Sequence, residues 1–290
     1  KSTNKIIKFF VYEGFGIGTV SFFLILPFIV VEYFNIISNY KLAVIFFAIQ
    51  IPCIIYGYIN SRKIKIKNIS IKSDLINKSI KFVFISDVHI GSNHSSYLKK
   101  IVSEIIKLDP IFLIIGGDLI DSSSFKIDDL KELKKLKKPI YFVTGNHEYY
   151  IQNSQKHLDD LHTVGIHTLN NESLQIHGLN LIGISDNITN NLKINYLDKL
   201  FQKELFNILV VHKPSIWKKV STKANLMLSG HTHNGQIFPF NFVVKLQFPE
   251  NYGLYTRNNN HLYVSSGSAT WGPKIRIGSN NEIIRIELKN

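Results

Sequence analysis

The chain has 290 residues, of which 45% are hydrophobic, so it can bury one large core or two smaller ones and is not intrinsically disordered. Its formal net charge of +13 comes mostly from lysines spread along the sequence, without a basic stripe interleaved with aromatic residues, so no nucleic-acid partner is expected. The single cysteine, Cys53, excludes an intramolecular disulfide and a cysteine-ligated zinc site.

Two long apolar runs dominate the N-terminal part of the chain. They extend from Phe15 to Ile37 and from Leu42 to Ile59, and each is close to the ~20 residues that cross the hydrocarbon core of a bilayer. A pair of buried core helices is the alternative interpretation. A cleaved signal peptide does not fit, because the first run is too long and no small-residue cleavage site precedes the second run. We therefore predict that residues 1–62 form a membrane anchor with two transmembrane helices.

Basic residues flank the outer ends of the two predicted spans, whereas the linker between the spans holds only Lys41. Positively charged flanks remain on the cytoplasmic side of a membrane. The chain is therefore expected to be a multi-pass protein of the cytoplasmic (inner) membrane, with the residues after the anchor facing the cytoplasm. The flanking residues are Lys1, Lys5, Lys8, Arg62, Lys63, Lys65 and Lys67.

Beyond the anchor, short apolar runs alternate with helical patterns. Alternating isoleucines between Ile64 and Ile71 predict an amphipathic strand or a pair of strands. The apolar spacing predicts helices from Tyr97 to Leu108 and from Ile127 to Leu136. This order begins as β-α-β-α-β and continues with a strand-rich half, which indicates an α/β fold. The further predicted strands are Ile80–Ile85, Ile111–Ile115, Ile140–Val143, Leu179–Ile184, Ile208–Val211 and Leu262–Val264.

Five apolar runs end in side chains that can bind metals. Carboxylate, imidazole or amide groups occur in SDVHIG, GGDLID, GNHEYY, VVHKP and SGHTHNGQ. Each motif alone is weak, because a D-x-H pair or a lone histidine after a strand is commonly structural. Together they indicate an active site, because sites of α/β sheets gather at the carboxyl ends of strands. The candidates are Asp87, His89, Asp118, Asp121, Asn146, His147, His212, His231 and His233.

The ordered blocks DxH, GDxxD, GNHE, a lone histidine and GHxH resemble the calcineurin-like metallophosphoesterase family. The flanking sequences, together with the late SGSATWGPKIRIG, are similar to its bacterial membrane-associated branch, which includes phosphodiesterases and enzymes that split a UDP-linked lipid pyrophosphate. The resemblance covers roughly residues 64–290. It implies a calcineurin-like phosphoesterase domain at 63–290 with a four-layer α/β/β/α sandwich, preceded by the two-helix transmembrane hairpin.

The resemblance also implies a site for two divalent metal ions. Two cations about 3.5 to 4 Å apart can share a hydroxide and neutralise the charge that develops on phosphoryl oxygens. Imidazole ligands favour Mn²⁺, with Fe or Zn²⁺ as alternatives, over Mg²⁺. By the resemblance, one metal is bound by Asp87, His89 and His233, the other by Asn146, His212 and His231, and Asp118 bridges both.

The pair His231 and His233 can serve both metals, because residues i and i+2 at a strand end point the same way. Thr232 between them is then expected to face away. By the resemblance, His147 lies near the leaving-group oxygen as a proton donor or charge stabiliser, and Asp121 accepts from its other nitrogen and orients the ring. The alternative for Asp121 is an N-cap of a helix that starts at Ser122.

Three features set this chain apart within the resemblance. Ser122 stands where protein phosphatases of the superfamily carry a phosphate-binding arginine, so phosphorylated protein is not an expected substrate. Asn234 replaces a glycine of the bacterial branch, and we expect it to take the left-handed backbone conformation that the glycine would take. The apolar segment from Gln236 to Phe248 is either a β-hairpin that closes a sheet or an apolar surface between the site and the bilayer.

These observations predict a metal-dependent phosphoric ester hydrolase that cleaves a phosphodiester or pyrophosphate bond. The expected substrate is lipid-linked, such as a UDP-diacylated sugar, so membrane lipid is the expected partner and no protein partner is predicted. A phosphodiesterase for a soluble nucleotide is the first alternative. A non-catalytic metal-binding scaffold is the second, although none of the seven proposed ligands is replaced.

Overall fold

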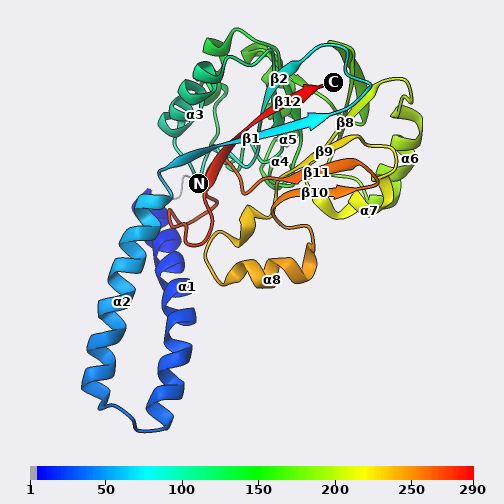
Figure 1. Ribbon diagram of the computed structural model, residues 1–290. Coiled ribbons are helices and arrows are strands. Elements are labelled where there is room, and N and C mark those ends of the chain that lie inside the picture. Colours follow the sequence, from blue (N-terminus) through cyan, green and yellow to red (C-terminus); the bar gives the residue numbers. More distant parts are fainter. Residues whose placement is uncertain (1–4) are drawn as a thin grey trace.

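The computed structural model describes residues 5–290 and shows a helical hairpin that projects from a mixed α/β body (Figure 1). Lys1, one of the lysines that flank the predicted anchor, lies outside the described residues. The hairpin consists of α1 (Lys5–Tyr33) and α2 (Asn39–Asn60). The segments Phe9–Tyr33 and Asn39–Asn60, with 25 and 22 residues, are long and apolar enough to cross a membrane.

The two helices are not core helices of the body. Only 11% of the most apolar stretch of α1 and 17% of that of α2 are buried against the rest of the chain. Apolar side chains such as Phe22 and Ile51 are exposed, at 59% and 53%. Such exposure is unfavourable in water and is the expected arrangement in lipid. The structure therefore favours the membrane-anchor interpretation of this segment over buried core helices.

The first sheet has six strands in the order β1-β12-β2-β3-β4-β5. The neighbouring strands β2, β3, β4 and β5 are parallel, and β12 runs parallel to β1 but antiparallel to β2. The strands from β2 to β4 are almost entirely buried, as is typical of parallel strands with both faces covered. Their bounds are β1 (Ile64–Lys72), β2 (Ile80–Ile85), β3 (Leu113–Gly116), β4 (Ile140–Val143), β5 (Ile166–Thr168) and β12 (Asn281–Lys289).

The second sheet also has six strands, in the order β10-β11-β9-β8-β7-β6. The four central strands, β11, β9, β8 and β7, are parallel, and each edge strand is antiparallel to its neighbour. The bounds are β6 (Glu172–Ile176), β7 (Leu179–Ile184), β8 (Phe206–Val211), β9 (Leu226–Ser229), β10 (Gly253–Arg257) and β11 (Asn260–Val264).

Helices cover the outer face of each sheet, and the inner faces pack on one another. The core between the sheets joins Phe84 of β2 to Val210 of β8. Their neighbours Val83 and Leu209 point to the opposite faces, because successive strand residues alternate, and they pack against the helices. The covering helices are α3 (Ser95–Leu108), η1 (Ile127–Leu136), α5 (Ser154–Asp160) and η2 (Leu161–Val164) on the first sheet, and α6 (Asn190–Leu200), η3 (Pro214–Ile216) and α7 (Trp217–Val220) on the second.

This arrangement confirms the predicted four-layer α/β/β/α fold and most of the predicted elements. Strands β2, β4 and β7 have the predicted bounds, and the predicted helix Ile127–Leu136 is present as the 3₁₀ helix η1. The isoleucine-rich segment after the anchor is one strand, β1, and not a pair. The proposed division at residues 62 and 63 stays a prediction, although β1 starts directly after it, at Ile64.

Two of the elements that differ from expectation lie in the C-terminal part of the chain. The segment Gln236–Phe248 forms no β-hairpin: it contains the helix α8 (Phe240–Gln247), which lies beside the base of the anchor hairpin (Figure 1). The last strand, β12, was not predicted, yet it lies between β1 and β2 and buries Ile284 and Ile286 completely. Its position depends on partners about 200 residues earlier in the chain, which the local pattern does not reveal.

Candidate metal centre

The loops that carry the candidate ligands meet at one end of the two sheets. Asp87, Asp118 and Asn146 follow the parallel strands β2, β3 and β4 of the first sheet. His212 and His231 follow the parallel strands β8 and β9 of the second sheet. A hydrogen bond from the backbone N–H of His231 to the carboxylate oxygen Oδ1 of Asp87, at 3.1 Å, joins the two sets of loops. The sheets therefore bring together side chains that are far apart in the sequence. Asp87 and His233, the most distant pair, are separated by 146 positions.

The first group of ligand atoms belongs to Asp87, His89 and His233, which are all buried and lie within 4.8 Å of one another. The Nε2 atoms of His89 and His233 are 3.1 Å apart, and Nε2 of His233 is 3.5 Å from Oδ1 of Asp87. These three residues are the predicted ligands of one metal. The structure places them together, while their role as ligands stays a prediction.

The second group consists of Asp118, His212 and His231, again within 4.8 Å. Nε2 of His212 lies 3.0 Å from Oδ2 of Asp118. The other ring nitrogen of His212 is 2.8 Å from the carbonyl oxygen of Gly116, which fixes the proton on Nδ1 and turns the lone pair of Nε2 toward the centre. Oδ2 of Asp118 is also 3.9 Å from Nε2 of His89. Asp118 thus lies between the two groups, as a bridging ligand requires.

The donor atoms fit a metal site, because several are buried without a hydrogen-bond partner. Oδ1 of Asn146 has none, and Nε2 of His212 makes no hydrogen bond despite its close approach to Asp118. An unsatisfied buried polar atom costs about 1 to 3 kcal/mol. Divalent cations would satisfy these atoms, and the mixture of imidazole, carboxylate and amide suits Mn²⁺, Fe or Zn²⁺.

His231 and His233 reach different groups, as predicted, but for a different reason than the one proposed. They do not sit on a strand: β9 ends at Ser229, and His233 begins the short 3₁₀ helix η4 (His233–Gly235). Their φ angles of 73° and 49° turn the backbone sharply, so a left-handed turn and not strand alternation separates the two rings. Thr232 does face away, since its hydroxyl donates to the carbonyl oxygen of Asn251 at 2.6 Å.

The backbone around the centre is unusually strained. Asp87, His89 and Asp118 have φ angles of 54°, 51° and 53°, in the left-handed region that costs a non-glycine residue about 1 to 2 kcal/mol. Non-glycine residues in this region cluster at functional sites. Asn234, with φ 50° and ψ 39°, takes the left-handed conformation expected from its replacement of glycine.

Glycines let two carboxylates approach the neighbouring loops. A Cβ atom on Gly145 would lie 2.1 Å from Oδ1 of Asp118, and one on Gly230 would lie 2.3 Å from Oδ2 of Asp87. Neither position tolerates a side chain, because real Cβ atoms do not approach that closely. These glycines are therefore required by the close packing of the ligand loops and not only by backbone freedom.

The site is buried and dense with charge, which perturbs the pKa values of its groups. Burial lowers the pKa of His212, but Asp118, Asp87 and Asp186 outweigh burial and raise it to about 10. Burial and the nearby His212 lower the pKa of His231 to about 3. Burial raises the pKa of Asp118, yet His212 and His89 lower it overall. Positive charge is thus strongly favoured beside the two carboxylates, and divalent cations would supply it.

In this structure Asp121 lies beside His89 and Ser92, and its predicted partnership with His147 stays a prediction. Oδ2 of Asp121 lies 3.4 Å from Nδ1 of His89, and Ser92 donates to the same carboxylate through its backbone N–H at 2.7 Å and through its hydroxyl. Asp121 therefore lies behind His89, where it can orient a metal ligand. It caps no helix, because the next helical segment begins only at Ile127.

His147 is nevertheless at the centre. Its Nε2 atom is 3.9 Å from Oδ2 of Asp118, its backbone N–H donates to Oδ1 of Asp118 at 2.9 Å, and its ring packs against Trp271 with the centroids 5.4 Å apart. It begins the short helix α4 (His147–Tyr150). Burial lowers its pKa, an effect that Asp118 partly offsets. The ring can thus meet a substrate beside the ligands, and its catalytic role stays a prediction.

Two buried charged residues near the centre were missed from the sequence. Glu148 accepts hydrogen bonds from the backbone N–H groups of Asp118, Ile120 and Gly145 at 3.0, 2.9 and 2.7 Å. It ties the loop after β3 to the loop after β4. Burial and the charge of Asp118 raise its pKa to about 7. In the sequence, Glu148 is marked only by its place in GNHE, directly after the candidates Asn146 and His147.

The second missed residue is Arg276, which is completely buried behind His233. Its guanidinium donates to the carbonyl oxygens of Ser266, Ala269 and His233 at 2.6, 2.7 and 3.2 Å. Burial lowers its pKa to about 10, so it remains charged near neutral pH. In the sequence, Arg276 is marked only by its place in GPKIRIG, a segment that resembles the bacterial membrane-associated branch.

The fold and the two ligand groups define a dinuclear metal centre of the phosphoesterase type, and the comparison with known families agrees. The model of the calcineurin-like phosphoesterase domain matches residues 80–235. The chain belongs to the calcineurin-like phosphoesterase family. This confirms the resemblance drawn from the five sequence blocks.

Similar proteins come from bacteria and vertebrates. An uncharacterised metallophosphoesterase of Helicobacter pylori is 35% identical over 77% of this chain and 64% of its own length. A Danio rerio transmembrane protein with a metallophosphoesterase domain is 31% identical over 87% of this chain and 64% of its own length. The chain thus spans just under two thirds of these relatives. The chain can also be superposed on a crystal structure of a dimetal phosphatase from Danio rerio. The match covers 65% of this chain and 87% of the phosphatase chain, at 12% identity and a TM-score of 0.46.

Proposed function

We propose that this protein is a membrane-associated phosphoester hydrolase that uses two divalent cations to cleave a phosphodiester or pyrophosphate bond, in a lipid-linked substrate such as a UDP-diacylated sugar. The observation that carries the proposal is the position of Asp118. Its carboxylate lies 3.0 Å from Nε2 of His212 in one ligand group and 3.9 Å from Nε2 of His89 in the other. A shared carboxylate fixes the spacing of two cations.

Two bound cations would supply a hydroxide at neutral pH and neutralise charge on the phosphoryl oxygens. The residues of this chain have the remaining tasks. Glu148 fixes the loop of Asp118 through three backbone N–H groups, and Asp121, 3.4 Å from Nδ1 of His89, would orient that ring. His147, at the rim of the ligand groups, would donate a proton from its ring to the leaving oxygen.

The imidazoles of the site support Mn²⁺, Fe or Zn²⁺ as the bound metals, and Mn²⁺ is our first choice. Membrane association has two supports: the two long apolar helices of this chain and the relative named a transmembrane protein. We further propose that the body faces the cytoplasm from a multi-pass anchor in the inner membrane, because basic residues flank both outer ends of the hairpin.

Turnover of a substrate panel by the full chain in detergent tests the proposal. The panel holds an aryl phosphodiester, an aryl phosphomonoester, a cyclic nucleotide and a UDP-diacylated sugar, each with Mn²⁺, Zn²⁺ or Mg²⁺ and with a chelator. We expect Mn²⁺-dependent cleavage of the diester and of the lipid pyrophosphate, and none by Asp118→Asn. Preference for the cyclic nucleotide would instead support a soluble nucleotide as the substrate. Metal binding without turnover of any compound would support the scaffold alternative.

A further inference from the structure

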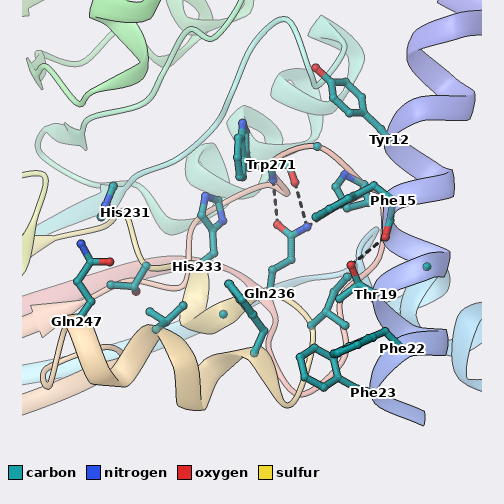
Figure 2. A pocket seen from close by; sticks show the side chains of 18 of the residues that line it. Tyr12, Phe15, Thr19, Phe22, Phe23, His231, His233, Gln236, Gln247 and Trp271 are labelled. Carbon is teal, nitrogen blue, oxygen red and sulfur yellow. Dashed lines mark hydrogen bonds between the residues drawn. The ribbon is translucent and has the colours of Figure 1, made fainter. Parts of the chain in front are cut away.

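A cavity of about 980 Å³ lies between the anchor, helix α8 and the metal centre. One wall is formed by α1, with Phe15 and Phe22, and another by α8, with Phe240. Its inner end is lined by His231 and His233, one from each ligand group. Figure 2 shows the aromatic side chains of α1 on one side of this space and the two histidines on the other. The volume is at the upper end of that of ordinary ligand pockets.

The outer walls of the cavity belong to parts of the chain that suit lipid. Phe15 and Phe22 lie within the segment Phe9–Tyr33 that can span a membrane, and they are 68% and 59% exposed. Helix α8 has no buried residue and exposes Phe242 and Leu246. A short helix with such an apolar face lies in the interfacial plane of a membrane. The cavity therefore begins at the level of the acyl chains and ends at the metal ligands.

Two of the polar side chains that line the cavity, those of Thr19 and Gln236, are already engaged in hydrogen bonds. The hydroxyl of Thr19 donates to the carbonyl oxygen of Phe15 at 2.8 Å. The amide of Gln236 donates to Trp271 and Pro273 and accepts from the N–H of Trp271, at 3.0 to 3.1 Å. These groups offer little to a polar ligand. Between its histidine end and its outer end, the cavity therefore presents mainly apolar surface.

The wall formed by α1 is docked on the body and not merely tethered to it. Gly16 packs so closely that an added Cβ would lie 2.6 Å from Cβ of Pro273. On α2, the carbonyl oxygen of Gly57 accepts from the N–H of Arg276 at 3.0 Å, and the amide of Asn60 donates to the carbonyl oxygen of Ser279 at 2.9 Å. The distance between α1 and the histidines is thus set by direct packing.

We infer that the transmembrane helix α1 forms part of the substrate site: the cavity between α1 and α8 binds an acyl chain of a lipid substrate while its phosphate lies at the metal ligands. The inference rests on the proposed hydrolase function and deepens it. An acyl chain is the occupant that matches both ends of the cavity, because it is apolar where α1 and α8 face lipid and is attached to phosphate where the histidines lie. The anchor then has a role in recognition besides location.

Gly18 allows a specific test, because it lines the cavity and has no atom within 4 Å of an added Cβ. Gly18→Phe would place a phenyl ring inside the cavity, between α1 and the histidine end, without disturbing the packing of α1. Gly14→Phe is the matched control: it lies one turn earlier on the same helix, is equally open and does not line the cavity.

The assay compares two chromogenic diesters with the same leaving group, diacylglycerol p-nitrophenyl phosphate and the acyl-free glycerol p-nitrophenyl phosphate. The full chain is reconstituted in nanodiscs with Mn²⁺. We expect the unmodified protein and Gly14→Phe to prefer the diacyl compound in kcat/KM by at least about tenfold, since even one methylene in an apolar pocket contributes that much. Gly18→Phe should lose this preference. A general loss of activity does not change the ratio of the two kcat/KM values, because both are measured on the same protein.

The outcomes separate this inference from the proposed function. Equal cleavage of both diesters by the unmodified protein, or an unchanged preference in Gly18→Phe, would overturn the acyl site and leave the hydrolase proposal intact. If neither diester is cleaved, the phosphodiesterase part of the hydrolase proposal fails, and photo-crosslinking tests whether the cavity binds an acyl chain. A phospholipid with a diazirine on one acyl chain should then label the segment 231–236, which forms the inner end of the cavity, in the unmodified protein and in Gly14→Phe, but not in Gly18→Phe. Without that labelling the inference is wrong.

Discussion

The clamp formed by Glu148 allows a quantitative prediction for Glu148→Ala. Three buried backbone N–H groups, those of Asp118, Ile120 and Gly145, would lose their acceptor. At about 1 to 3 kcal/mol for each unsatisfied group, the loss is about 3 to 9 kcal/mol. Alanine also removes a buried carboxylate whose ionised form is unfavourable in the folded protein. Its removal therefore restores part of the lost free energy of unfolding.

The size of this restored free energy follows from the pKa of Glu148, which burial and the charge of Asp118 raise from 4.5 to about 7. A raised pKa of an acid means that its ionised form is disfavoured in the folded state. This cost is absent below pH 4.5 and complete above pH 7, where it amounts to about 3 kcal/mol. The net destabilisation by Glu148→Ala at pH 8 is therefore up to about 6 kcal/mol, with about 3 kcal/mol in the middle of the range. For a body of this size it lowers the Tm by on the order of 10 °C.

The measurement is thermal unfolding of the full chain in detergent at pH 8 with a chelator present, so that altered metal binding does not contribute. The fluorescence of Trp217, which is buried in the body, reports unfolding. Glu204→Ala is the control, because Glu204 is exposed and its removal should change the unfolding free energy by under about 0.5 kcal/mol. If Glu148→Ala unfolds at the same temperature as Glu204→Ala, Glu148 does not hold the two ligand loops together.

Three further substitutions test the assigned roles. Asp118→Asn should abolish turnover and reduce the bound metal, and full metal content measured by mass spectrometry would contradict a bridging role. His147→Ala should lower kcat by roughly 10² to 10⁴ with both metals retained, and loss of metal would identify His147 as a ligand instead. Asp121→Asn should weaken metal affinity about 10- to 100-fold, because Asp121 holds the ring of His89. An altered pH profile with unchanged metal affinity would favour the original partnership of Asp121 with His147.

Much of the site was predictable from the sequence, because its signals are local. Each ligand motif directly follows a short apolar run, and parallel strands place such ends at one edge. Asp118 could be placed beside His212 only through the family resemblance, because β3 and β8 lie in different sheets. The four-layer fold followed from the same alternation of strands and helices together with the family resemblance.

The remaining features depend on contacts between distant segments. The partner of Asp121 is set by a hydrogen bond from Ser92 that turns the carboxylate toward His89, and no spacing in GDLID indicates this. The separation of His231 and His233 depends on left-handed φ angles, which histidine rarely adopts and which a strand pattern does not predict. Helix α8 was missed because its apolar face serves no core: none of its residues is buried within the chain.

One loop explains why the anchor and the metal centre belong to one functional unit. Arg276 donates its backbone N–H to Gly57 of α2 at 3.0 Å and its guanidinium to the carbonyl oxygen of His233 at 3.2 Å. A displacement of the hairpin would therefore move the backbone of Arg276, and with it the group that supports a metal ligand. A flexible tether would need no such contact, and the structure has only three residues between the end of α2 at Asn60 and the start of β1 at Ile64. The close packing of α1 on Pro273 maintains the same geometry from the other helix. The hairpin thus fixes the position of the candidate ligands relative to the two long apolar helices, which is the condition under which, in the proposed function, a lipid could reach the ligands without leaving the bilayer.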